Sequence, residues 1–164
     1  MDYFSAMKAA TINELKQELL NEKPAKLVEL CIRLARFKKE NKELLTYLLF
    51  EAHDTEAYIK SVIQEMDSNF ETINKSNAYF VKKTLRKILR ITHKFIRYSG
   101  SDIVATELLI HFCKTVKKMD KSITTNQVII NIYQNQLKKI NKAIAAMHED
   151  VQYDYWQEVE TLSN

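Results

Sequence analysis

Glycine and proline are almost absent from this sequence, which has one of each, Gly100 and Pro24, in 164 residues. Strands joined by tight turns draw on both residues, because such turns need a positive φ or a fixed φ. Their scarcity therefore predicts helices joined by short links. It also excludes P-loops and dinucleotide-binding fingerprints, since these need two or three glycines close together.

Long apolar runs are missing as well. The longest uncharged one, residues 44–50, is far too short to cross a bilayer. The first 20 residues mix acids with bases and lack the apolar core of a secretory signal. The two cysteines, Cys31 and Cys113, both sit among apolar residues, which favours reduced core thiols over a disulfide framework. We therefore expect a cytoplasmic protein with no membrane segment.

What the sequence does contain is typical of one globular domain. Hydrophobic residues make up 46% and charged residues 28% of the chain, which excludes intrinsic disorder. A chain of 164 residues is long enough to bury a core without metals or disulfides. We expect a single all-α domain over residues 1–164, frayed at 1–10 and ending in an acidic helix or tail at 149–164.

Capping signals divide the chain into seven or eight helices. Residues 11–14 have capping-box spacing, Pro24 suits the first turn of a helix, and Gly100 suits the position just past a helix end. Further N-caps are expected at Asn41, Asp54 and Ser76. The expected helices are 12–21, 24–38, 41–52, 55–73, 77–98, 103–118, 125–147 and 150–161. Segment 41–52 is apolar almost all round, which predicts a central buried helix.

Two arrangements of these helices are open: an α-α superhelix of stacked antiparallel pairs, which we favour, and an irregular helical bundle. A weak internal echo supports the superhelix. Residues 28–36 (VELCIRLAR) resemble residues 106–114 (TELLIHFCK), and each is followed after a short link by another apolar helix. Convergence of unrelated amphipathic helices explains the echo about as well.

The helix pairs 24–38 with 41–52, and 103–118 with 125–147, resemble the α-α superhelix folds of the HEAT and armadillo kind. The stretches LVELCIRLARFKKENKELLTYLLFEAH and VKKTLRKILRITHKFIRYSG also resemble an uncharacterised bacterial all-helical family. The first resemblance implies stacked helix pairs. Neither implies an activity, a cofactor or a functional residue.

The sharpest local feature is a basic helix. From Thr72 to Ser101 there are eight bases and no acid. On a helical wheel, the seven bases of the expected helix 77–98 cover one face of roughly 140°, and apolar side chains cover the opposite face. Tyr79 lies amid the bases and His93 borders them. The candidate binding face comprises Tyr79, Lys82, Lys83, Arg86, Arg90, His93 and Arg97.

Seven cations along some 22 Å of helix repel one another unless something negative lies close. Nucleic-acid phosphates fit, with Tyr79 available to stack on a base, and so does an acidic protein. A membrane surface fits less well, because the apolar side of the helix is needed for the core. The chain also offers its own candidate, since Asp150, Asp154 and Glu158 recur every four residues in the acidic tail. A solvated or internally compensated face therefore stays open beside the two external partners.

Signals for chemistry are weak elsewhere. Glu107 and His111 share a helical face, but no Glu-x-x-His motif of di-iron bundles occurs. There is no Gly-x-Ser-x-Gly, and neither cysteine sits in a recognisable reactive motif. An amide- and lysine-rich face in segment 125–147 is typical of a plain polar surface. We expect no catalytic residues, no metal site and no cofactor.

Two functions follow as hypotheses. The first is a non-enzymatic interaction module, an array of helices whose exposed grooves bind another protein, with an acidic protein among the partners left open. The alternative is nucleic-acid binding through the basic face of helix 77–98. An enzyme with a dispersed site would need a concave pocket that holds ionisable groups with perturbed pKa values.

Overall fold

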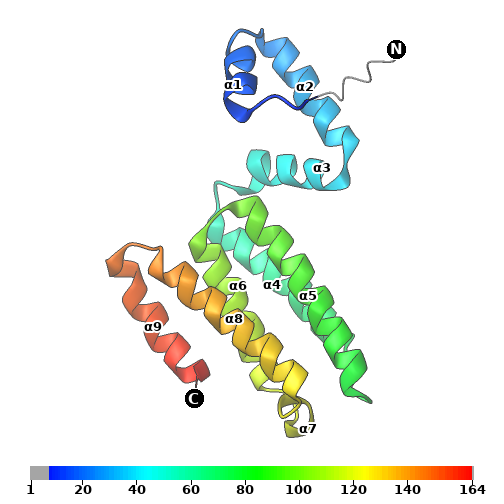
Figure 1. Cartoon of the computed structure of the whole chain (residues 1–164), viewed down its shortest axis with the longest axis vertical. Coiled ribbons are helices and arrows are strands. Elements are labelled where there is room, and N and C mark those ends of the chain that lie inside the picture. The colour runs from blue at the N-terminus through cyan, green and yellow to red at the C-terminus, as the bar shows by residue number, and fades with distance from the viewer. Residues whose placement is uncertain (1–7, 164) are drawn as a thin grey trace, which may run out of the picture. The chain divides into compact units, whose positions relative to one another are not determined.

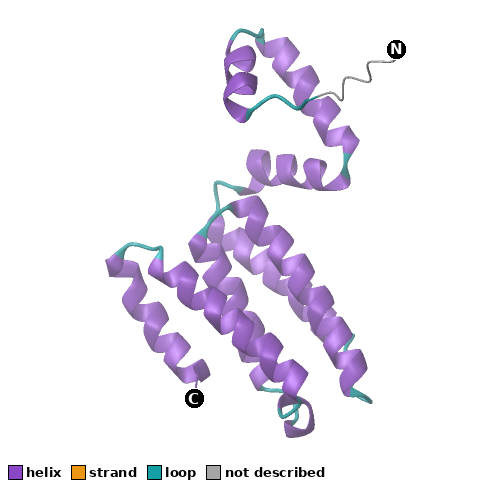
Figure 2. Cartoon of the chain, viewed as in Figure 1, coloured by secondary structure: helices purple, strands orange, loops and turns teal. Residues whose placement is uncertain are grey.

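A computed structural model describes residues 8–163, and over that range the chain is helical, without strands (Figures 1 and 2). The all-α prediction is confirmed. Contacts group the chain into two units, which meet at Thr46 and Tyr47. We call residues 8–46 the N-terminal unit and residues 47–163 the C-terminal unit. Residues 1–7 of the predicted frayed start lie outside the described range.

The N-terminal unit consists of α1 (Ile12–Leu20), α2 (Pro24–Phe37) and α3 (Lys39–Thr46), with α2 packed on α3. The predicted capping box is present. The Thr11 hydroxyl accepts from the Glu14 amide at 3.3 Å, and the Glu14 carboxylate accepts from the Thr11 amide at 2.7 Å. The prediction that Asn41 caps the N-terminus of a helix is wrong. The Asn41 side-chain amide donates to the carbonyl of Leu34 at 2.8 Å, and α3 begins two residues earlier.

None of the helices α1, α2 and α3 has a buried side chain. The prediction that Cys31 is a core thiol is therefore wrong, because this thiol is exposed on α2. The physical reason is geometric. The apolar residues of α2 spread over roughly 220° of its circumference, which is more than α3 can cover.

The C-terminal unit opens with a π-helical turn, η1 (Tyr47–Glu51), followed by α4 (Thr55–Glu71) and α5 (Ala78–Ser99). It continues with α6 (Asp102–Lys117), α7 (Lys121–Thr124), α8 (Gln127–Ala145) and α9 (Glu149–Ser163). Asp54 caps α4 as predicted. Asn77 caps α5 in place of the predicted Ser76, because its side-chain oxygen accepts from the Tyr79 amide. Gly100 ends α5 at φ 59°, the left-handed conformation expected of a C-terminal glycine.

The central helix of the C-terminal unit is α6, which contacts α4, α5, α8 and α9. Leu108, Phe112 and Cys113 are each 0% exposed, and burial raises the pKa of the Cys113 thiol to about 12. The prediction that segment 41–52 forms the central helix is wrong, since its Leu48–Phe50 stretch is exposed. The segment changes from α to π geometry at Tyr47, so an α-helical wheel does not describe its faces.

The helices of the C-terminal unit form an array of antiparallel neighbours, α4 with α5 and α6 with α8, and α9 packs on α8 and α6 (Figure 1). In Figure 1 the green α5 and the red α9 lie at opposite edges of this array. Such an array suits the bundle alternative as well as stacked pairs, and the superhelix stays a prediction. In the part of the chain that the structure describes, none of the helices has the length and apolar character needed to span a bilayer.

Candidate functional site

The candidate binding face lies on α5, a 22-residue helix with no acid, glycine or proline inside it. Its apolar side is fixed in the core by five buried side chains: Val81, Leu85, Ile88, Leu89 and Thr92. The opposite side therefore has to face outward. Five bases on that side are exposed: Lys83, Arg86, Lys87, Arg90 and Arg97. Lys82 is half-buried.

Tyr79 stands in the first turn of α5 and is 57% exposed. Its ring makes an edge-to-face contact with Phe80, at 5.5 Å between centroids. The ammonium of Lys82 lies 5.1 Å from the centre of the Tyr79 ring. A cation beside an exposed aromatic ring is a combination that can hold a phosphate and stack a base at neighbouring points of one strand.

His93, at the edge of the candidate binding face, connects α5 with α8. It is half-buried, and its Nε2 atom lies 2.9 Å from the Nζ atom of Lys139 on α8. Burial lowers the pKa of His93, and the nearby charge of Lys139 lowers it further. The neutral ring accepts a hydrogen bond from the ammonium. Lys139 has no signal in the sequence that connects it with α5, because 46 residues separate the two side chains.

The acidic tail does not lie on α5. As α9 it packs on α6 and α8, and one of its acids and one of its tyrosines make side-chain contacts with α6. Glu158 pairs with Lys114 of α6, and the hydroxyl of Tyr155 donates to Glu107 at 2.7 Å. Among residues 8–163, no carboxylate lies within ion-pair distance of Arg86, Arg90 or Arg97. These three arginines are therefore available to an external anion.

Glu107 and His111, which share a helical face in the sequence, each contact a different neighbouring helix. Glu107 accepts from Tyr155, and His111 lies 2.6 Å from a carboxylate oxygen of Asp67 on α4. Each contact ties α6 to a different neighbour, which explains both side chains as structural. Over the described residues, no group of three or more potential ligands gathers at one point.

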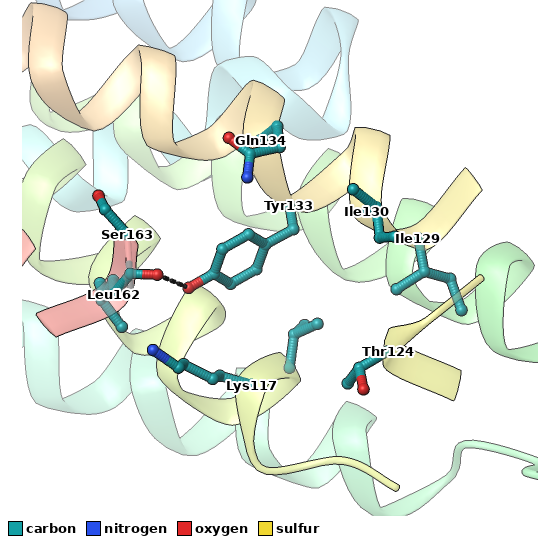
Figure 3. A pocket seen from close by; sticks show the side chains of 9 residues that line it. Lys117, Thr124, Ile129, Ile130, Tyr133, Gln134, Leu162 and Ser163 are labelled. Carbon is teal, nitrogen blue, oxygen red and sulfur yellow. Dashed lines mark hydrogen bonds between the residues drawn. The ribbon is translucent and has the colours of Figure 1, made fainter. Parts of the chain in front are cut away.

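A pocket of about 270 Å³ lies where α6, α7, α8 and α9 meet (Figure 3). Its two ionisable side chains are occupied in holding α9. Tyr133 donates to the carbonyl of Leu162 at 2.7 Å, and the Lys117 ammonium donates to the carbonyl of Thr161 at 2.7 Å. Burial raises the pKa of Tyr133 to about 12, so the phenol stays protonated. Through these two contacts, α6 and α8 hold the end of α9 at the wall of the pocket.

Comparison of the chain with protein-family models, with curated proteins and with solved structures gives no match. The case for a function therefore rests on the geometry of α5 and of the helices around it.

Proposed function

We propose that this protein is a non-catalytic binding module for single-stranded nucleic acid, and that the basic face of α5 is its binding surface. The observation that carries the proposal is the position of α9. The acidic C-terminal helix, whose row of carboxylates complements α5 on charge alone, is docked on α6 and α8 instead.

The electrostatics of α5 support an external anion. Lys83, Arg86, Lys87 and Arg90 stand three or four residues apart, which places each like charge beside the next along the helix. This repulsion lowers the stability of the helix, and the phosphates of a bound strand would relieve it. Exposed Tyr79 supplies the stacking platform that single-strand binders combine with a basic groove.

Binding should depend steeply on salt. The five exposed bases of α5, if each contacts a phosphate, contribute about −3.5 to the slope of the logarithm of affinity against the logarithm of salt concentration. Raising the salt from about 50 to about 200 mM should then weaken binding at least roughly 100-fold. Fluorescence anisotropy of a labelled oligouridylate with the full chain would measure this slope. Absence of binding at about 50 mM salt would overturn the proposal.

A second candidate, a protein-binding module, is supported by the N-terminal unit. Its side chains are nowhere buried, and its largest apolar ones are exposed. They are Ile12, Leu15, Leu19 and Leu20 on α1, and Val28, Ile32, Leu34 and Phe37 on α2. The partner we propose is a second copy of this chain, because a two-fold axis would pair the exposed apolar side chains of α1 and α2 with the same set on the other copy.

Charge is self-complementary in this unit. Glu14 and Glu18 line one face of α1, Glu22 follows in the link after it, and Arg33 and Arg36 lie near the end of α2, so a two-fold axis can set the acids of each copy opposite the bases of the other. Sedimentation velocity at rising concentration should show a dimer. Replacing Leu20 and Val28 with Asp should leave a folded monomer. A monomeric parent chain at high concentration would refute the dimer.

A further inference from the structure

We infer that the binding surface does not end at α5 but continues onto α8, and that Lys138, Lys139 and Lys142 hold a second stretch of the same nucleic-acid strand. The inference rests on the proposed function and adds to it. The polar face of α8, which the sequence identifies only as an ordinary surface, becomes half of the site.

The contact between His93 and Lys139 joins the two faces. His93 lies at one edge of the basic arc of α5, roughly 20° from Lys82 on the helical wheel. Lys139 lies at one edge of the polar arc of α8, next to buried Ile132. Since these edge residues meet at 2.9 Å, the exposed arcs of α5 and α8 adjoin. Both helices pack on α6.

Charge is segregated onto these two helices. Together α5 and α8 carry ten Lys and Arg and no Asp or Glu. The other residues of the C-terminal unit carry six Lys and Arg and fourteen Asp and Glu. The two helices carry a net charge of +10, the rest of the C-terminal unit −8 and residues 1–46 +2, so the chain total of +4 conceals the separation. An extended polyanion would be attracted to the two helices and repelled by the rest.

Amides on α8 favour nucleic acid over an acidic protein. Asn131, Asn135 and Asn141 are exposed on the same polar face as the three lysines. A carboxamide offers a donor and an acceptor side by side, which matches the edge of a base, whereas a run of carboxylates offers only acceptors. The lysines can hold phosphates while neighbouring amides contact bases.

The two halves of the site can be tested separately. Replacing Lys138, Lys139 and Lys142 with Gln should lower the salt slope for an oligouridylate of about 16 nucleotides by about 2, and weaken binding roughly 10- to 100-fold. The matched control replaces Lys60, Lys118 and Lys121 with Gln. These lysines are exposed too, and their loss changes the net charge by the same amount, but none lies on α5 or α8. The control should keep the parent slope.

The outcomes distinguish the inference from the proposal beneath it. If the α8 variant matches the control while the replacement of Arg86 and Arg90 by Glu still removes binding, the site is confined to α5 and this inference is wrong. If the parent chain binds a poly-glutamate peptide but no oligonucleotide, both the inference and the proposed function are overturned. A slope lowered only by the α8 variant supports the two-helix site.

Discussion

Replacing Arg86 and Arg90 with Glu should weaken the binding of a single-stranded oligonucleotide about 100-fold or more at moderate salt. Both guanidinium groups are exposed, and neither has an ion-pair partner among the described residues. The substitutions remove two phosphate contacts and place two carboxylates in the path of the strand, so attraction becomes repulsion at the middle of α5. Anisotropy titrations of parent and variant would measure the loss.

The fold should survive this change. Each introduced carboxylate has lysines three or four residues away, Lys82, Lys83 and Lys87 among them, so attraction to these lysines replaces repulsion, and the only new like-charge pair is that between the two glutamates. We expect the melting temperature to stay the same or to rise slightly. The control variant carries Lys60→Glu and Lys121→Glu, which lower the net charge by the same amount away from the proposed face. Equal losses in variant and control would show that only net charge matters and would contradict a specific surface.

Helix positions follow from the sequence wherever a local signal sets them. The capping box at Thr11, the N-cap at Asp54 and the C-terminal Gly100 are all where their spacing predicts. Each depends on hydrogen bonds within one turn, which the local sequence controls. Ser76 and Asn77 are adjacent residues with equal capping ability, and the choice between them depends on the chain that precedes α5.

Burial is harder to predict than helicity, because it depends on which helices meet. The segment 41–52 and the helix α6 are both apolar on several sides, yet α6 is the one enclosed by four neighbours. Nothing in the composition of either segment specifies its neighbours. The same limit explains Cys31 and Cys113, which have similar apolar surroundings in sequence but opposite exposure.

The candidate site shows the same division. Amphipathic periodicity alone places the exposed bases of α5 on one face, because a helix wheel needs no tertiary contact. The position of the acidic tail, in contrast, depends on tertiary contacts. The row of Asp150, Asp154 and Glu158 complements α5 on charge alone, but Val159 and Leu162 of the same helix are buried where α9 packs on α6 and α8. Burial of apolar area outweighs surface ion pairs, which contribute about 0 to 1 kcal/mol each.

Stability should depend most on the centre of α6. Replacing Phe112 with Ala should lower the free energy of unfolding by about 3 to 5 kcal/mol, because the ring is 0% exposed and packs on Phe70 with centroids 5.6 Å apart. The melting temperature should fall on the order of 10 to 20 °C, which differential scanning calorimetry would measure. Phe112→Leu keeps much of the apolar volume and should cost far less. Equal effects of Ala and Leu would mean that the ring is not packed as described.

Comparing the Phe112→Ala variant with the Arg86 and Arg90 variant distinguishes effects on stability from effects on binding. Phe112 is fully buried and the proposed phosphate contacts lie on the outer faces of α5 and α8, so the remaining folded Phe112→Ala protein should bind the oligonucleotide normally at low temperature. The Arg86 and Arg90 variant should show the reverse, with stability kept and binding lost. Loss of binding by folded Phe112→Ala protein would instead indicate that the surface depends on the exact spacing of α5 and α8 across α6. That spacing is the property on which the two-helix site rests.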